Sequence, residues 1–290
     1  MMSRILVLLL ALYAEAFAVG GTLDLSLPRI YSRATNEFST AHFIKPAETQ
    51  DLDTTFKLAP LIIQEALADE PLQEGFGALS LSNGVVILDR STPTVYVQVD
   101  QVEIASKAHQ RFTYLWCYSS GGDPVHGSQA LGIQGVRITI DSAGSPVIWE
   151  ILADESGLDL VFVAESLEAS AKEQWGNVQS GRRFALEQAQ RKTPRTVIAR
   201  VIADGPVPMG PIVYLQRNTR NVSTLVCRCM PAQAKSLLTS SVYLLKPIQA
   251  ENSDLLLQML RDRLKFRASF WPGAKDAPGI EKKLRLPKNF

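Results

Sequence analysis

The chain has 290 residues, of which 46% are hydrophobic and 20% charged. These proportions are typical of a globular protein and exclude an intrinsically disordered one. The formal net charge of +1 gives no overall reason to expect nucleic acid or an anionic surface as a partner, so no nucleic-acid partner is predicted.

Residues 1–18 have the pattern of a cleaved secretory signal peptide. A positively charged start precedes an apolar run over residues 5–13, and Ala16 and Ala18 supply small residues at the spacing that signal peptidase reads. The run is about half the ~20 residues that a membrane-spanning helix requires, so a retained anchor is the less favoured alternative. We therefore expect a secreted or periplasmic protein that begins near Val19 and has no membrane span after cleavage.

Beyond this segment the patterns are mostly those of strands. A helix is predicted over 57–69, where apolar residues recur at three-four spacing around Pro60. Residues 94–104 alternate, with Val95, Val97 and Val99 on one face, which indicates a half-buried strand. Further runs rich in Val, Ile, Tyr and Phe predict strands at 85–88, 112–118, 136–140, 147–152, 160–164, 196–202, 212–216, 224–229 and 242–245.

Two turns and three further helices complete the predicted elements. The segment Asp141-Ser-Ala-Gly-Ser-Pro146 combines the residues of a tight hairpin, and Asn83-Gly84 is a second turn signal. Short helices are predicted at 165–175, 232–238 and 254–266.

Strands thus outnumber helices and do not alternate regularly with them. This predicts the α+β class, β-rich, with a largely antiparallel sheet and a few peripheral helices. We expect an extended N-terminal segment at 19–56, a globular region at 57–266, possible subdomains joined near 177–195, and a basic tail at 267–290. Residues 261–290 hold nine basic and three acidic residues. An acidic face of the same protein or solvent is the favoured partner of this excess charge, with an external anion as the alternative.

Three cysteines leave three arrangements open. Cys227 and Cys229 lie two apart in a predicted strand, so their Cα atoms would be roughly 6.5–7 Å apart, at or beyond the limit for an unstrained disulfide. We therefore expect that these two do not bond to each other and that any native disulfide includes Cys117. The alternatives are three buried free cysteines or a shared metal.

The loop that follows the aromatic run Thr113-Tyr-Leu-Trp-Cys-Tyr118 is the first candidate for chemistry. Ser120, Asp123 and His126 are the residue types of a nucleophile, an orienting acid and a base, although a triad is defined by geometry rather than by proximity in sequence. His109 and His126 with Cys227 and Cys229 could supply nitrogen and sulfur ligands to zinc, but their spacing matches no compact zinc motif.

Other features suggest partners rather than reactions. Trp175, Trp271 and Tyr118 lie near predicted turns, where they could stack against carbohydrate or protein, or cover the core. Asn221-Val-Ser223 would accept a glycan in a eukaryotic secretory pathway. The sequence contains no G-x-S-x-G, H-E-x-x-H, P-loop or C-x-x-C motif. We therefore expect a non-catalytic binding or structural protein, with a metal-assisted or serine-type hydrolase that uses the 117–127 loop as the alternative.

Overall fold

The computed structural model describes residues 27–35, 38–48, 53–69, 76–82, 85–119, 131–154, 156–176, 178–188, 196–229, 234–248 and 279–290. Its elements in chain order are α2 (Leu27–Arg33), β1 (Thr40–Pro46), α3 (Thr54–Leu58), β2 (Leu61–Glu65), β3 (Ala78–Ser82), β4 (Val85–Asp89), β5 (Thr94–Ile104), β6 (Lys107–Ser119), β7 (Leu131–Ile140), β8 (Pro146–Leu152), β9 (Asp159–Ala164), α4 (Glu165–Trp175), β10 (Thr196–Ile202), β11 (Pro211–Leu215), β12 (Val222–Cys227), β13 (Ser236–Pro247) and α6 (Ile280–Lys283). The signal-peptide prediction and the predicted helix at 254–266 fall outside these residues.

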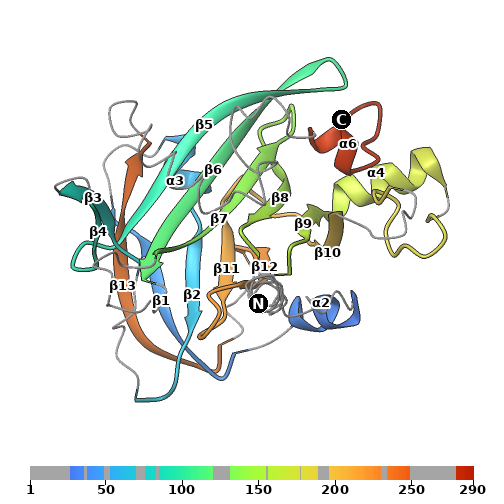
Figure 1. Ribbon diagram of the computed structural model, residues 1–290. Coiled ribbons are helices and arrows are strands. Elements are labelled where there is room, and N and C mark those ends of the chain that lie inside the picture. Colours follow the sequence, from blue (N-terminus) through green and yellow to red (C-terminus); the bar gives the residue numbers. More distant parts are fainter. Residues whose placement is uncertain are drawn as a thin grey trace, which may run out of the picture.

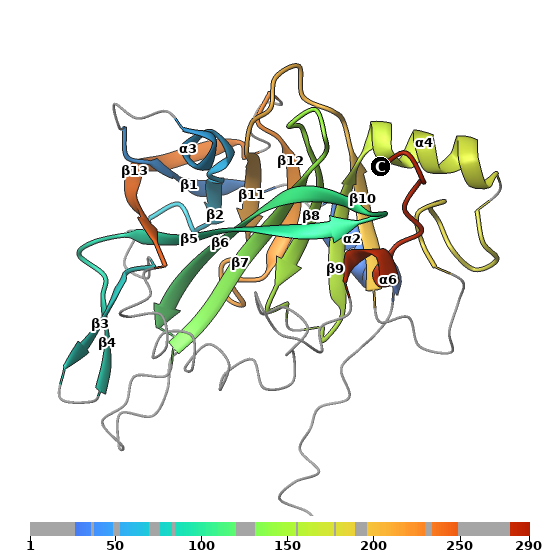
Figure 2. The same ribbon diagram turned by 90° about the horizontal axis from the view of Figure 1, so that it is seen from above.

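Eleven strands form one sheet in the order β10-β9-β8-β7-β6-β5-β13-β1-β2-β11-β12. The sheet curls on itself until its two end strands approach each other (Figure 1), and Arg200 on β10 donates a 3.4 Å hydrogen bond to Thr224 on β12. The strands β3 and β4 form a separate hairpin that projects from this sheet (Figure 2). The described part of the protein is therefore a nearly closed, strand-rich barrel with few helices.

The sheet is mixed, which corrects the expectation of a largely antiparallel one. Consecutive strands β5 to β9 pair antiparallel, as do β1 with β2 and β11 with β12. Four pairings are parallel: β1 with β13, β2 with β11, β5 with β13 and β9 with β10. The parallel pairs join strands that are distant in the chain or separated by a helix. Local sequence patterns do not show which of these strands become neighbours in the sheet.

Large side chains fill the inside of the curled sheet. Phe112, Tyr114 and Trp116 alternate along β6 and are at most 2% exposed. They belong to one apolar cluster with residues from the neighbouring strands. The alternating valines of β5 agree with this core only in part, because Val97 is 6% exposed whereas Val99 is 47% exposed.

The predicted helix over 57–69 is wrong. The helix α3 begins after Asp53, whose Oδ1 accepts the Phe56 N–H at 2.8 Å, and it ends at Leu58. Pro60 interrupts it, and the following residues form β2. Ile62 and Ile63 are both 0% exposed. Neighbouring residues of a strand point to opposite faces, so burial of both indicates a strand that is covered on two faces. A surface helix instead buries one stripe of residues three or four apart.

The predicted helix over 232–238 is also wrong where the structure describes it, since β13 begins at Ser236 and pairs with β1 and β5. The predicted helix at 165–175 is confirmed with the same bounds as α4. Strands are confirmed in the described parts of all the predicted strand segments, although β12 ends at Cys227 rather than at residue 229.

Two segments that the sequence places outside the globular region are packed into it. Strand β1, within 19–56, lies between β13 and β2 in the sheet. In the C-terminal segment, which we define as residues 279–290, Ile280, Leu284 and Phe290 are at most 7% exposed. The division into subdomains near 177–195 stays a prediction.

Candidate functional site

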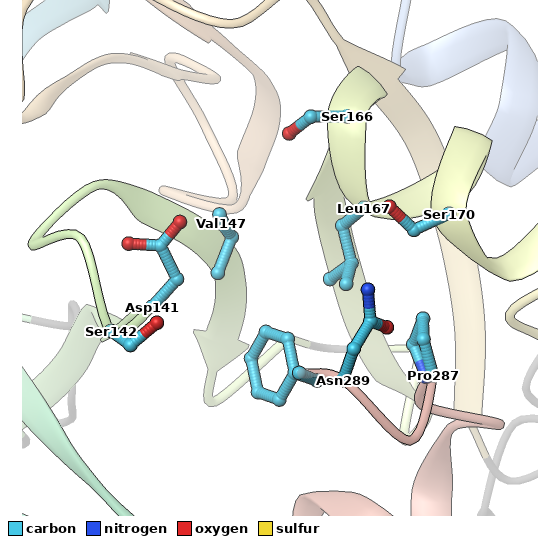
Figure 3. Close-up of a pocket in the computed structure, with 9 residues that line it drawn as sticks. Asp141, Ser142, Val147, Ser166, Leu167, Ser170, Pro287 and Asn289 are labelled. Atoms are coloured by element: carbon cyan, nitrogen blue, oxygen red, sulfur yellow. The ribbon is translucent and has the colours of Figure 1, made fainter.

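A pocket of about 170 Å³ lies where the β7–β8 turn, helix α4 and the C-terminal segment meet (Figure 3). Its lining residues come from these three places: Asp141, Ser142 and Val147; Ser166, Leu167 and Ser170; and Pro287, Asn289 and Phe290. Each wall is held in place by its own set of interactions.

The first wall is the predicted hairpin at 141–146, which the structure confirms. Asp141 Oδ1 accepts the backbone N–H groups of Ala143 at 2.9 Å and Ser145 at 2.8 Å. Gly144 has a φ of +83°, a conformation that L side chains rarely adopt. The Asp141 carboxylate therefore stabilises the turn that forms this side of the pocket.

The second wall is the first two turns of α4. Ser166 donates its backbone N–H to Asp204 Oδ2 at 2.8 Å and its hydroxyl to Asp204 Oδ1 at 2.5 Å. A carboxylate at a helix N-terminus compensates backbone N–H groups that have no partner within the helix. Ser170 lies one turn further along the same face, as four-residue spacing on a helix requires.

The third wall is the end of the C-terminal segment. The Phe290 ring stacks on His109 with 4.7 Å between ring centroids and 7° between planes. His109 Nδ1 contacts the Ile140 carbonyl oxygen at 3.0 Å, so this nitrogen carries the proton that is donated. Lys107 Nζ donates to the Asn289 carbonyl oxygen at 3.1 Å. These contacts fix the last residues against β6 and β7.

A buried charge cluster anchors the same segment closer to α6. Lys283 Nζ lies 2.9 Å from Glu150 Oε1 and 3.7 Å from Asp159 Oδ2, and Arg137 lies 3.7 Å from Glu150 Oε2. Burial acts to raise the pKa of Glu150, but the charges of Lys283 and Arg137 outweigh it and hold this pKa below its usual value. For Lys283, the expectation that the basic tail meets acidic groups of the same protein is confirmed.

The pocket itself offers uncharged hydrogen-bonding groups beside apolar ones. The side chains of Ser142, Ser170 and Asn289 make no hydrogen bond to any other residue that the structure describes. Apolar surface comes from Val147, Leu167, Pro287 and Phe290. Such a lining can bind a small ligand that has both hydroxyl or amide groups and an apolar face.

The predicted hydrolytic residues Ser120, Asp123 and His126 lie outside the described residues. The predicted metal ligand His109 is 2% exposed and stacks on Phe290, which lines the pocket. Within the ranges that the structure describes, no three His, Cys, Asp or Glu side chains are grouped so that they could hold a metal ion. Among the described candidates, Cys227 and Cys229 therefore form no such group with His109, and His126 lies outside the described residues.

The cysteine prediction is wrong, because Cys227 and Cys229 form a disulfide with each other and Cys117 is free and buried. The prediction assumed strand geometry through residue 229. Strand β12 ends at Cys227 and the next two residues turn, so the two Cα atoms are 5.3 Å apart, within the disulfide range. Burial raises the pKa of the Cys117 thiol to about 12.

Three of the other candidates lie in described residues, whereas Trp271 lies outside them. Tyr118 is half-buried and packs against the core. Trp175 is half-buried and donates its Nε1–H to the Arg285 carbonyl oxygen at 3.2 Å, so it packs against the C-terminal segment. Asn221 is 4% exposed, which places this possible glycan acceptor inside the folded protein.

Sequence reasoning identified the turn at 141–146 but missed the pocket beside it. The serine spacing of four in α4 was available as a signal, since residues 165–175 were predicted to be helical. No local pattern connects either segment to residues 287–290.

Comparisons of this chain with protein-family models, with curated proteins and with solved structures find no match. In the portion of the chain that the structure covers, no helix combines the length and the apolar character needed to cross a bilayer.

Proposed function

We propose that this protein is exported and that its pocket between the β7–β8 turn, α4 and the C-terminal segment binds a ligand without catalysing a reaction on it. The proposed ligand is one small polyhydroxylated unit, such as a sugar ring of a larger glycan. The observation that carries the proposal is the set of polar side chains at Ser142, Ser170 and Asn289 that face this pocket without partners in the described chain. Export is proposed from the signal-peptide pattern of residues 1–18.

The chemistry of the lining favours a neutral ligand. Serine hydroxyls and an asparagine amide both donate and accept hydrogen bonds, which matches the hydroxyl groups of a sugar. Asp141 Oδ1 accepts two backbone N–H groups of its own turn, so this oxygen is already engaged within the protein. Val147 and Leu167 offer apolar surface to the C–H face of such a ring.

The size of the pocket favours a single small unit. Pockets for drug-sized ligands measure roughly 300–1,000 Å³. At about 170 Å³, this pocket lies below the range for drug-sized ligands and suits one small unit. A larger glycan would place one unit in the pocket and extend the rest along the surface.

The test is a titration of the isotope-labelled full chain with a panel of neutral monosaccharides and short glycans, followed by backbone amide NMR. We expect shifts at Ser142, Ser170 and Asn289 for at least one compound. Loss of a single hydrogen bond is worth about 0.5–1.5 kcal/mol, so Ser170→Ala and Asn289→Ala should each weaken binding about two- to tenfold. Ser240→Ala, at an exposed site on β13, is the matched control. Shifts confined to other surfaces, or equal affinities for all variants, would refute the proposal.

A further inference from the structure

The disulfide between Cys227 and Cys229 lies at the surface and links neighbouring residues. Cys227 is half-buried at the end of β12, an end strand of the sheet (Figure 1), and Cys229 is exposed in the turn that follows. The chain-entropy stabilisation that a disulfide gives increases with the length of the loop that it closes. A bond between residues two apart closes almost no loop, so structural cross-linking is a poor explanation for it.

The pair is held together by the residue between its members. The Arg228 guanidinium donates a hydrogen bond to the Ala59 carbonyl oxygen beside α3. This contact fixes the middle of the Cys-Arg-Cys turn from the inner side, while Cys229 remains exposed. We therefore expect the two sulfurs to stay adjacent in the reduced state as well, which would favour rapid closure of the disulfide.

The surface around the pair is open and partly apolar. A Cβ atom on Gly205 would lie 2.9 Å from Cys227 Sγ and 3.3 Å from the Val207 carbonyl oxygen, so only glycine leaves this side of the sulfur free. The loop containing Gly205 carries Val207 at 59% and Met209 at 39% exposure. An extended polypeptide could contact these side chains while it reaches the disulfide.

The local backbone also favours one direction of bond cleavage. The Cys229 N–H donates to Cys227 Sγ at 3.3 Å. A hydrogen bond to sulfur stabilises a thiolate, and a stabilised thiolate is the better leaving group. Because Cys229 is also the more exposed of the two, it is the sulfur at which an incoming thiolate should attack.

We propose that Cys227 and Cys229 form a redox-active disulfide that oxidises cysteine pairs in extended polypeptide segments. A thiolate of the partner polypeptide attacks Cys229 Sγ, the Cys227–Cys229 bond breaks, and Cys227 leaves as a thiolate. The second partner thiol loses its proton and attacks the partner sulfur of the mixed disulfide, which releases Cys229. The partner loses two electrons and two protons and gains a disulfide, and Cys227 and Cys229 end as two thiols.

The first test is equilibration of the full chain in buffers with a graded ratio of reduced to oxidised glutathione, with acid quenching, thiol alkylation and peptide mapping by mass spectrometry. We expect Cys227 and Cys229 to change together, from both unlabelled to both labelled, within the range of the series. Cys117 is a free thiol at every ratio, so it is labelled throughout in the acid-unfolded chain and is the internal control. A pair that stays bonded in the most reducing buffer, or never bonds in the most oxidising one, overturns the proposal.

The second test uses a reduced synthetic peptide with two cysteines as the substrate. The wild-type chain and Cys117→Ser should oxidise the peptide, and Cys227→Ser and Cys229→Ser should lose this activity while circular dichroism shows them folded. With oxidised glutathione, Cys227→Ser should form the mixed disulfide at Cys229 faster than Cys229→Ser forms it at Cys227. Peptide oxidation that survives in either single variant, or a wild-type chain that reacts no faster than glutathione alone, overturns the proposal.

Discussion

Replacing Lys283 by methionine tests how the C-terminal segment is attached. The Lys283 ammonium lies 2.9 Å from Glu150 and 3.7 Å from Asp159, and the three side chains are at most 4% exposed. Methionine keeps most of the apolar volume but leaves two buried carboxylates with one fewer cation. Removing one partner of a buried ion pair typically costs about 3–5 kcal/mol, and we expect Lys283→Met to lower the free energy of unfolding by about this amount.

The pH dependence of stability tests whether the lost charge causes the destabilisation of Lys283→Met. Glu150 has a lowered pKa in the folded protein, so its ion pairs contribute stability above its unfolded pKa of about 4.3, and this contribution is lost as the pH falls through the folded value. In Lys283→Met the pKa of Glu150 should rise, because burial still raises this pKa while one of the positive charges that lower it is gone. The stability difference between wild type and variant should therefore be largest near pH 7 and shrink in acid.

Urea denaturation followed by circular dichroism at several pH values measures both effects. Lys282→Met removes an exposed charge from the neighbouring residue and should change stability by less than about 0.5 kcal/mol. Glu150→Gln combined with Lys283→Met should recover part of the loss, because it removes the unpaired charge. A loss below about 1 kcal/mol for Lys283→Met, where the reasoning requires about 3–5, would show that this segment is not docked as described.

Three further predictions test other parts of the fold. Val97→Asp should cost about 3–5 kcal/mol because Val97 is 6% exposed in the core, whereas Gln98→Asp should stay within about 0.5 kcal/mol, and equal thermal shifts would contradict this. Gly210→Ala should cost about 1–3 kcal/mol in urea denaturation, because its Cβ would lie 2.2 Å from the Leu58 carbonyl oxygen. Cys117, whose pKa burial raises to about 12, should resist iodoacetamide at pH 8 until the protein unfolds, and labelling of the native protein would show that this site is open.

The elements that the sequence predicts well are those whose cause is local. The alternation of residues 94–104 and the Asp141 turn chemistry depend on neighbours in the chain, and both elements appear with the predicted bounds. Strand β2 was mistaken for helix because a run of apolar residues buried on both faces carries no period of two. The parallel neighbours of β13 are set by the closure of the whole sheet, which no short pattern reports.

The cysteine pairing and the pocket could not be predicted for a related reason, whereas the Ser120, Asp123 and His126 hypothesis stays a prediction. The spacing argument for Cys227 and Cys229 was sound for a strand, but β12 ends at the first of them. The binding pocket is assembled from residues 141–147, 166–170 and 287–290, which meet only after the sheet has formed. Composition could show that the end of the chain is basic, but it could not show that Lys283 is buried against β8 and β9.

The C-terminal segment connects stability to the proposed binding function. Lys283 anchors its beginning in the charge cluster, and Asn289 and Phe290 at its end line the pocket. A change that releases the anchor therefore removes one wall of the pocket without touching a ligand-binding group. If Lys283→Met stays folded but loses its C-terminal contacts, it should bind the glycan more weakly than Asn289→Ala does, because it loses the whole wall rather than one hydrogen bond. Equal affinities for these two variants would mean that the segment remains in place without its buried charge.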